Sequence, residues 1–297
     1  MSHDNPKGLA HPNEFETSDK ISISWICNKL NKISKHCCAD VMAIYGPIWP
    51  PLDATFRLAI ERTKSDKDNL LVIVDTPGGY AEITERIVEL MRFHYDEVKF
   101  LVPDKAMSAG TILVMSGDAI IMDQFSRLGP VDPQIYLEGK ATPVSVLSYL
   151  EAYQEIVQKS KKRDLTTAEL VLLQQFDLAD LRQYELSAQL SVTLIQEWLI
   201  RYKFKDWSTH SDSKEPVTRE EKEERAKEIA TALSDQSTWR THQRMISRDT
   251  LEILKLKIDK LEDDCHLASL VSDFHWFLTD FAFNRKLGQL VISPTYF

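Results

Sequence analysis

The segment 69–74 (NLLVIV) constrains the fold most strongly, because an almost unbroken apolar run is typical of a parallel strand that is buried on both faces. It ends at the turn 75–79 (DTPGG). Further short strands are expected at 40–45 (DVMAIY), 98–102 (VKFLV) and 119–122 (AIIM). Helical spacing of apolar residues separates these runs, over 52–64, 80–94 and 107–117. The alternation predicts an α/β fold in which right-handed crossovers join the strands of a parallel sheet.

Glycine and proline divide the chain into two unlike halves. Eight of the nine glycines precede residue 140, and no other follows until Gly288. Only Pro216 lies between Pro143 and Pro294. Since both residue types punctuate strands and turns, the second half is expected to be a large helical region. Its predicted helices cover 144–161, 166–202, a stretch after Thr218, and 267–283. We therefore predict an N-terminal extension (1–39), an α/β core (40–140) and a helical C-terminal region (141–297).

Composition excludes several classes of function. The chain has 36 basic and 45 acidic residues, a formal charge of −9, which disfavours a nucleic-acid partner. No apolar run approaches the ~20 residues of a membrane span, and the polar N-terminus is unlike a signal peptide. The four cysteines form no CxxC pair, and no HxxxH or HExxH motif is present. We expect a cytoplasmic protein with free thiols, no metal and no cofactor.

The turn after the first buried run carries Pro77, Gly78 and Gly79. Two glycines at this place let the backbone adopt positive φ and turn amide N–H groups toward a ligand. Such amides could form an oxyanion hole, in which preoriented donors stabilise charge on a carbonyl oxygen. If so, Gly79→Ala should lower activity more than stability. The alternative is a tight turn that serves only the entry to the next helix.

The second turn contains Ser108, within the segment 106–111 (AMSAGT). A strand turns into a helix here, so the hydroxyl is expected at the carboxyl end of the sheet, where ligands of α/β proteins bind. Ser108 is a candidate nucleophile for that reason. It is equally a candidate helix N-cap, the commoner role of a serine at such a position. The residues alone leave these two interpretations open.

The combination of motifs resembles a known family. DTPGG, then AMSAGT, then 126–134 (SRLGPVDPQ) is similar to the Clp-peptidase/crotonase superfamily, and more narrowly to the serine dehydrogenase proteinases, relatives of signal peptide peptidase A. The helical segments 172–199 and 242–271 resemble that family as well. The resemblance implies a Clp/crotonase-like α/β fold with ββα units, and a serine peptidase acting on polypeptides. Ser108 would be the nucleophile, and the amides of Gly78 or Gly79 and of Ala109 would hold the oxyanion.

The general base is the incomplete part of this pattern. Clp peptidases place a histidine about 25 residues after the serine, where this chain has Asp132; signal peptide peptidases use a lysine, and Lys140 lies near the corresponding position. Asp132 is a natural turn residue, and Lys140 is typical of a solvated loop. His242 could approach the site only if the helical region folded back on the core. His275, in an apolar helix, is expected to have a hydrogen-bonded structural role.

Two other functions are compatible with these residues. A catalytically silent, peptide-binding or oligomeric interaction protein would explain the missing base. A crotonase-like acyl-thioester enzyme would use the same oxyanion hole without a nucleophilic serine. The resemblance also implies a homo-oligomer, and the aromatic residues of 267–283 surround more of that helix than one buried face requires. We expect this helix to contact both its own sheet and a neighbouring subunit.

Overall fold

The structure is a computed structural model, and it describes residues 17–135, 144–174, 176–210 and 214–297. Its centre is a six-stranded sheet in the order β10-β5-β3-β2-β1-β11. The four predicted strands are present as β1 (Asp40–Tyr45), β2 (Asn69–Asp75), β3 (Glu97–Val102) and β5 (Ala119–Met122), all parallel to one another. The predicted α/β class with a parallel sheet is therefore confirmed.

Two strands of this sheet come from the region that the sequence predicted to be helical. β10 (Asp259–Lys260) extends the sheet in parallel beside β5, and β11 (Leu290–Ile292) pairs antiparallel with β1. Both are very short, so they show no alternation that a sequence pattern could reveal. The C-terminal region thus completes both edges of the sheet.

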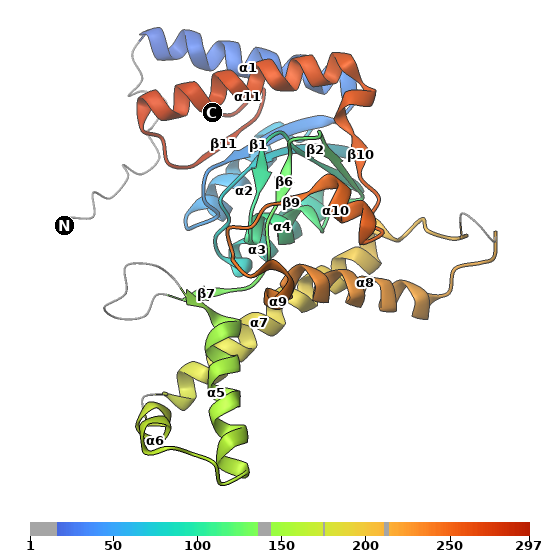
Figure 1. The fold of residues 1–297 in the computed structure, drawn as a ribbon. Helices are drawn as coiled ribbons and strands as arrows, with labels where there is room; N and C mark the ends of the chain where they lie inside the picture. Colours follow the sequence, from blue (N-terminus) through green and yellow to red (C-terminus); the bar gives the residue numbers. More distant parts are fainter. Residues whose placement is uncertain (1–16, 136–143, 175, 211–213) are drawn as a thin grey trace.

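Both faces of the sheet are buried, as the run NLLVIV predicted. Leu70, Val72 and Val74 pack with α2 (Leu52–Thr63), α3 (Ala81–His94) and the short α4 (Ala109–Val114). The alternate residues Leu71 and Ile73 face α1 (Thr17–Cys37) and α11 (Cys265–Arg285). Figure 1 shows this second pair of helices as a layer above the sheet. Helix α1, which the sequence pattern did not reveal, is therefore a part of the core.

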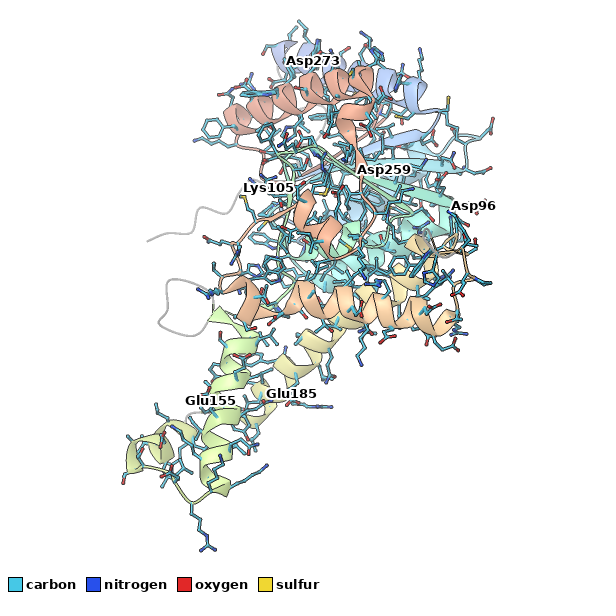
Figure 2. All side chains as sticks on the ribbon, turned by 45° about the vertical axis from the view of Figure 1, so that its right-hand side comes forward. Asp96, Lys105, Glu155, Glu185, Asp259 and Asp273 are labelled. Carbon is cyan, nitrogen blue, oxygen red and sulfur yellow. The ribbon has the colours of Figure 1, made fainter. Side chains whose placement is uncertain are left out.

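The helices of the second half form a base and a projecting arm (Figure 1). α7 (Leu178–Trp198) packs against α8 (Arg219–Ser234), whereas α5 (Val146–Lys161) and α6 (Thr167–Leu173) lie with the first turns of α7 in the arm. The arm has a small core of Val146, Leu150 and Leu181. Glu155 and Glu185 lie on its surface (Figure 2).

The prediction of one helix over 166–202 is wrong in part. Two separate helices, α6 and α7, form in this range. Asp177 caps α7 by accepting hydrogen bonds from the amides of Ala179 (2.7 Å) and Asp180 (3.3 Å). α7 then ends in a π-helical turn, Leu199–Lys203. By contrast, the helix predicted after Thr218 is present as α8, and a capping box begins it, in which the side chains of Thr218 and Glu221 each accept a hydrogen bond from the other's amide.

A second, three-stranded sheet joins distant parts of the chain. β6 (Arg127–Leu128) pairs in parallel with β4 (Lys105–Ala106) and antiparallel with β9 (Ile246–Ser247). β9 leads directly into α10 (Arg248–Ile253). The four-residue helix α9 (Gln236–Trp239) lies between α8 and β9 in the chain. The strands β7 (Gln134–Ile135) and β8 (Val144–Ser145) form a separate antiparallel pair. Figure 1 shows β6 and β9 together below the main sheet.

Helix α11 meets a partner that the sequence did not predict. Phe274 and Leu278 are buried against the sheet. The face of α11 that carries Phe277 is covered by α1, and the ring centroids of Trp25 and Phe277 lie 4.3 Å apart. Part of the surface expected to contact a neighbouring subunit is thus covered within the same chain. Trp276 (77% exposed) and Phe283 (80% exposed) remain on the outside. Within the described ranges, no helix is long and apolar enough to cross a membrane.

Candidate active site

The two turns singled out in the sequence lie next to each other. Thr76 donates its amide hydrogen to Lys105 O (3.0 Å), and Met107 donates to Thr76 O (3.0 Å), so the turn after β2 is joined to the turn after β4. A Cβ placed on Gly78 would lie 2.8 Å from the Cβ of Ser108. Figure 2 labels Lys105, which begins β4 three residues before Ser108. The turns that carry Gly78 and Ser108 therefore form one site.

Ser108 has a backbone conformation that few residues adopt. Its φ of 52° and ψ of −115° lie outside the regions open to ordinary side chains. The turn is closed by a hydrogen bond from Gly110 N to Met107 O (2.8 Å). Ser108 occupies the N-cap position of α4, but its hydroxyl makes no capping hydrogen bond to that helix. A strained serine at a strand-to-helix turn is the arrangement in which α/β-hydrolases expose a nucleophile.

The amides beside Ser108 differ in the partners they already have. Gly78 N donates to Thr76 Oγ1 (3.0 Å), a bond within its own turn. Gly79 is held from both sides by Ile48, which donates to Gly78 O (2.8 Å) and accepts from Tyr80 N (2.9 Å). The amides of Gly79 and Ala109 donate no hydrogen bond within the described part of the chain. These two, rather than Gly78, are therefore the donors available for an oxyanion.

Gly78 and Gly79 are required for different reasons. Gly78 has a φ of 101°, which favours glycine, and it also approaches Ser108 closely. A Cβ at Gly79 would collide with the carbonyl oxygen of Ile48. Gly79→Ala would thus disturb the packing of the turn together with its amide. This substitution does not separate activity from stability in the way that the sequence suggested.

Buried contacts fix the nucleophile turn to the strand beside it. Thr111 is fully buried; its hydroxyl donates to Ala106 O (2.7 Å) or Gly129 O (2.9 Å) and accepts from Gly129 N (3.0 Å). A Cβ on Gly110 would collide with the methyl group of Thr76. These contacts hold the turn that carries Ser108 against the residue that follows β6, Gly129.

Asp132, a candidate base in the sequence, follows β6 and is 2% exposed. Its Oδ1 lies 2.8 Å from Nδ1 of His242, and its Oδ2 accepts a hydrogen bond from Gln134 Nε2 (3.1 Å). His242 comes from the segment before β9, which folds back along β6. This is the approach that the sequence left open for His242. The pairing itself had no signal in the sequence, because 110 positions separate the two residues.

Lys140, the second candidate base in the sequence, lies outside the described residues. Lys105 forms a partly exposed ion pair with its neighbour Asp104 (3.3 Å). His275 has the structural role expected of it, since its Nε2 lies 2.8 Å from Asp75 Oδ2 beneath α11. Over the ranges that the structure describes, no group of three or more histidine, cysteine or acidic side chains could hold a metal ion.

A cavity of about 270 Å³ lies next to the segment that holds Asp132. Val131 and Pro133, which flank Asp132, form one wall of this cavity, and α5 and α7 supply most of the remainder. Its lining consists mainly of apolar and small polar side chains: Val131, Pro133, Leu147, Ala188, Gln189, Val192, Thr193 and Ser234. Its size suits a single amino-acid side chain.

Comparisons with known proteins bear on the same region. Two uncharacterised proteins of Methanocaldococcus jannaschii are similar: MJ0137 is 34% identical over 112 residues, and MJ1495 is 29% identical over 188 residues. These matches cover 38% and 63% of this chain, but only 37% and 51% of the lengths of the two relatives.

Among solved structures, two mutant forms of the 1510-N membrane-bound stomatin-specific protease match 41% of this chain. One of them is in complex with a substrate peptide. The matches cover 63% and 59% of those chains at 20% and 22% identity, each with a TM-score of 0.32.

The family model of the ClpP-like SDH-type serine proteinases matches residues 53–174. This range contains the turn with Gly78 and Gly79, the turn with Ser108, and Asp132. The sequence resemblance is thereby confirmed, and residues 53–174 of this chain are similar to the ClpP-like serine proteinases of the SDH type.

Proposed function

We propose that this protein is a serine peptidase in which Ser108 is the nucleophile. The observation that carries the proposal is the strained backbone of Ser108 beside two amides, those of Gly79 and Ala109, that have no acceptor within the described residues. Strain of this kind costs about 1–3 kcal/mol and persists where the surrounding structure holds it in place. A serine that only joined a strand to a helix would not need it.

The arrangement fits acyl transfer. Ser108 Oγ attacks the carbonyl carbon of the scissile bond, and the developing negative charge on the carbonyl oxygen is met by the Gly79 and Ala109 amides. The C–N bond breaks as the serine proton is transferred to the departing amine nitrogen, and an ester on Ser108 remains. Water then hydrolyses this ester, which releases the acid and restores the Ser108 hydroxyl. Each donor of an oxyanion hole typically contributes about 10²–10³-fold in rate.

The proposed substrates are polypeptides. The family match to serine proteinases supports this class, and the cavity beside Asp132 could accept one side chain of a bound peptide. We also propose that the protein acts in the cytoplasm as a homo-oligomer. The exposed aromatic residues Trp276 and Phe283 of α11 support a contact between subunits.

Labelling with a fluorophosphonate tests the proposed function. The probe should modify the wild-type protein at Ser108, and Ser108→Ala should not react. Ser22→Ala, on α1, is the control and should react like the wild type. A mixture of peptides should be cleaved by the wild type and by the control, and not by Ser108→Ala.

Two outcomes would contradict the proposal. A folded wild-type protein that neither reacts nor cleaves peptides would instead be the catalytically silent, peptide-binding alternative. Hydrolysis of acyl thioesters that survives in Ser108→Ala would favour the crotonase-like alternative, which needs the oxyanion hole but no nucleophilic serine.

A further inference from the structure

We propose that the tip of the arm of one copy of this chain docks in the groove between α7 and α8 of a second copy. The arm tip is defined as residues 159–173, which comprise the end of α5, the following loop and α6. This inference rests on the homo-oligomer proposed above, but not on the chemistry at Ser108. The contact differs from the one that the aromatic residues of α11 support.

Helix α6 carries apolar side chains that the rest of the described chain leaves uncovered. None of its seven residues is buried, and Leu170 (50%), Val171 (53%) and Leu172 (49%) are about half exposed. The small core of the arm lies between α5 and α7 instead. Single exposed apolar residues are common, whereas three in a row form a patch of the kind that contacts another molecule.

Positive charge adjoins this apolar patch. Lys159 pairs with Glu169 (2.6 Å), which ties the end of α5 to α6. Residues 161–163 (KKR) are exposed and form no ion pair with any other residue that the structure describes. The arm tip holds four basic and two acidic side chains in all, in a chain whose formal charge is −9. It therefore presents an apolar surface with an excess of positive charge.

The groove lies at the base of the arm, where α7 packs against α8 (Figure 1). Its volume is about 910 Å³, and it is lined by residues between 193 and 200 on one side and between 223 and 235 on the other. At 1.5 Å per residue these walls are about 10 Å and about 18 Å long. A helix of seven residues, such as α6, is about 10 Å long and fits this length.

The charge of the groove is opposite to that of the arm tip. Five of its lining residues are acidic and only Lys227 is basic, while Ile200 and Ala232 provide apolar surface. Glu223 and Glu228 are bonded to arginines of their own helix. Ion pairs on an exposed helix contribute little to stability, so both carboxylates can accept a cation from another molecule.

Negative charge extends from the groove to α3. Burial raises the pKa of the Glu85 carboxyl, and nearby carboxylates, Glu197 of the groove among them, raise it further. Like charges close together disfavour one another, and a positive surface in the groove would relieve this repulsion. The groove and the arm tip are therefore complementary in charge as well as in length.

A second copy of the chain is the occupant that satisfies both surfaces. The arm projects away from α8, and no residue of the arm tip lines the groove of its own copy (Figure 1). Two copies can exchange arms about a two-fold axis, so that each gives one tip and receives the other, and the assembly closes. An anionic lipid surface would match the tip alone, and a basic peptide would match the groove alone.

The experiment measures mass by light scattering over a range of protein concentrations, with melting temperature as the check on folding. Two sets of charge reversals are compared, one in the arm tip and one in the groove: Lys161→Glu with Lys162→Glu and Arg163→Glu, and Glu223→Lys with Glu224→Lys and Glu228→Lys. Each set alone should weaken association by about 10²-fold or more and lower the mass about twofold, because like charges then meet. Both sets in one chain should restore it.

The controls separate this contact from general effects of charge. Reversing Lys255, Lys257 and Lys260 to glutamate changes the net charge as much as the arm set does, and it should leave the mass unchanged. The groove set brings the net charge from −9 to −3, so general repulsion alone would strengthen association rather than weaken it.

The apolar part of the contact has its own test. Leu170→Asp combined with Leu172→Asp should lower the mass about twofold, because charged side chains would then enter the groove. Leu58→Asp, at a residue of α2 that is 53% exposed, is the matched control and should have no effect.

The outcomes distinguish this contact from the other proposals. An unchanged mass in the folded arm and groove variants overturns the inference, and so does a double reversal that fails to restore association. If Trp276→Glu alone lowers the mass, the homo-oligomer remains and is built by α11. A wild type of about 34 kDa at every concentration overturns the homo-oligomer and the arm contact together. None of these results changes the labelling of Ser108, which tests the peptidase separately.

Discussion

Replacing Ser108 by glycine should stabilise the protein while it abolishes activity. At φ 52° and ψ −115° a side chain is strained, and a glycine is not. Relief of this strain should contribute about 1–3 kcal/mol to the free energy of unfolding. The greater freedom of glycine in the unfolded chain offsets about 0.4–1 kcal/mol of that gain.

Ser108→Ala is the reference, because alanine keeps the Cβ and the strain. The Ser108 hydroxyl makes no capping hydrogen bond, so the loss of such a bond does not contribute to the difference in stability between the variants and the wild type. We therefore expect the free energy of unfolding of Ser108→Gly to exceed that of Ser108→Ala by roughly 0.5–2 kcal/mol. For a chain of this length the melting temperature should differ by about 1–5 °C.

Urea unfolding of the two variants at one protein concentration measures the difference, and equal m-values would show that the same surface unfolds in both. Neither variant should react with a fluorophosphonate. If Ser108→Ala is as stable as Ser108→Gly or more so, the backbone at Ser108 is not strained. Ser108 would then lack the strained conformation that supports its role as a nucleophile.

Four other perturbations test separate parts of the structure. Gly78→Ala should abolish labelling of Ser108 and lower the melting temperature, because the new Cβ would lie 2.8 Å from that of Ser108; normal labelling would contradict the proximity of the turns. Phe274→Ala should cost about 3–5 kcal/mol in urea unfolding, since this fully buried ring joins α11 to the sheet, and a cost under 1 kcal/mol would contradict that packing. Burial lowers the pKa of Lys203 from 10.5 to about 8, so between these pH values the unfolded chain binds more protons than the folded one and the free energy of unfolding should rise with pH. Lys203→Met should remove this rise, and a pH profile of stability that is the same in both proteins would contradict the assignment to Lys203. Trp276→Glu should leave the fold intact and reduce the mass measured by light scattering if α11 joins subunits, whereas an unchanged mass near 34 kDa in both proteins would exclude the homo-oligomer.

The α/β core and the two turns of the site could be predicted from the residues alone. An apolar run such as 69–74 can be recognised from its own residues, because a strand buried on both faces cannot carry polar side chains in its middle. The glycines at 78 and 79 and the serine at 108 follow such runs directly, so their place at the carboxyl end of the sheet was predictable. The long helices of the second half followed from the same kind of periodic pattern.

The strand pairings of the second half were decided only by the tertiary structure. β6 and β9 are two residues long, and a strand of two residues has no periodicity by which it can be recognised. Helix α1 is amphipathic, but the elements that bury its apolar face, α11 and the sheet, are known only from the tertiary structure.

The contact made by Asp132 also depended on the tertiary structure. A carboxylate before a proline has the same local pattern whether it only closes a turn or also binds a distant side chain. Asp132 contacts a histidine 110 positions away, which lies just before β9 and comes within 2.8 Å of it. Such contacts arise from packing between distant segments, and therefore no local pattern in the sequence records them.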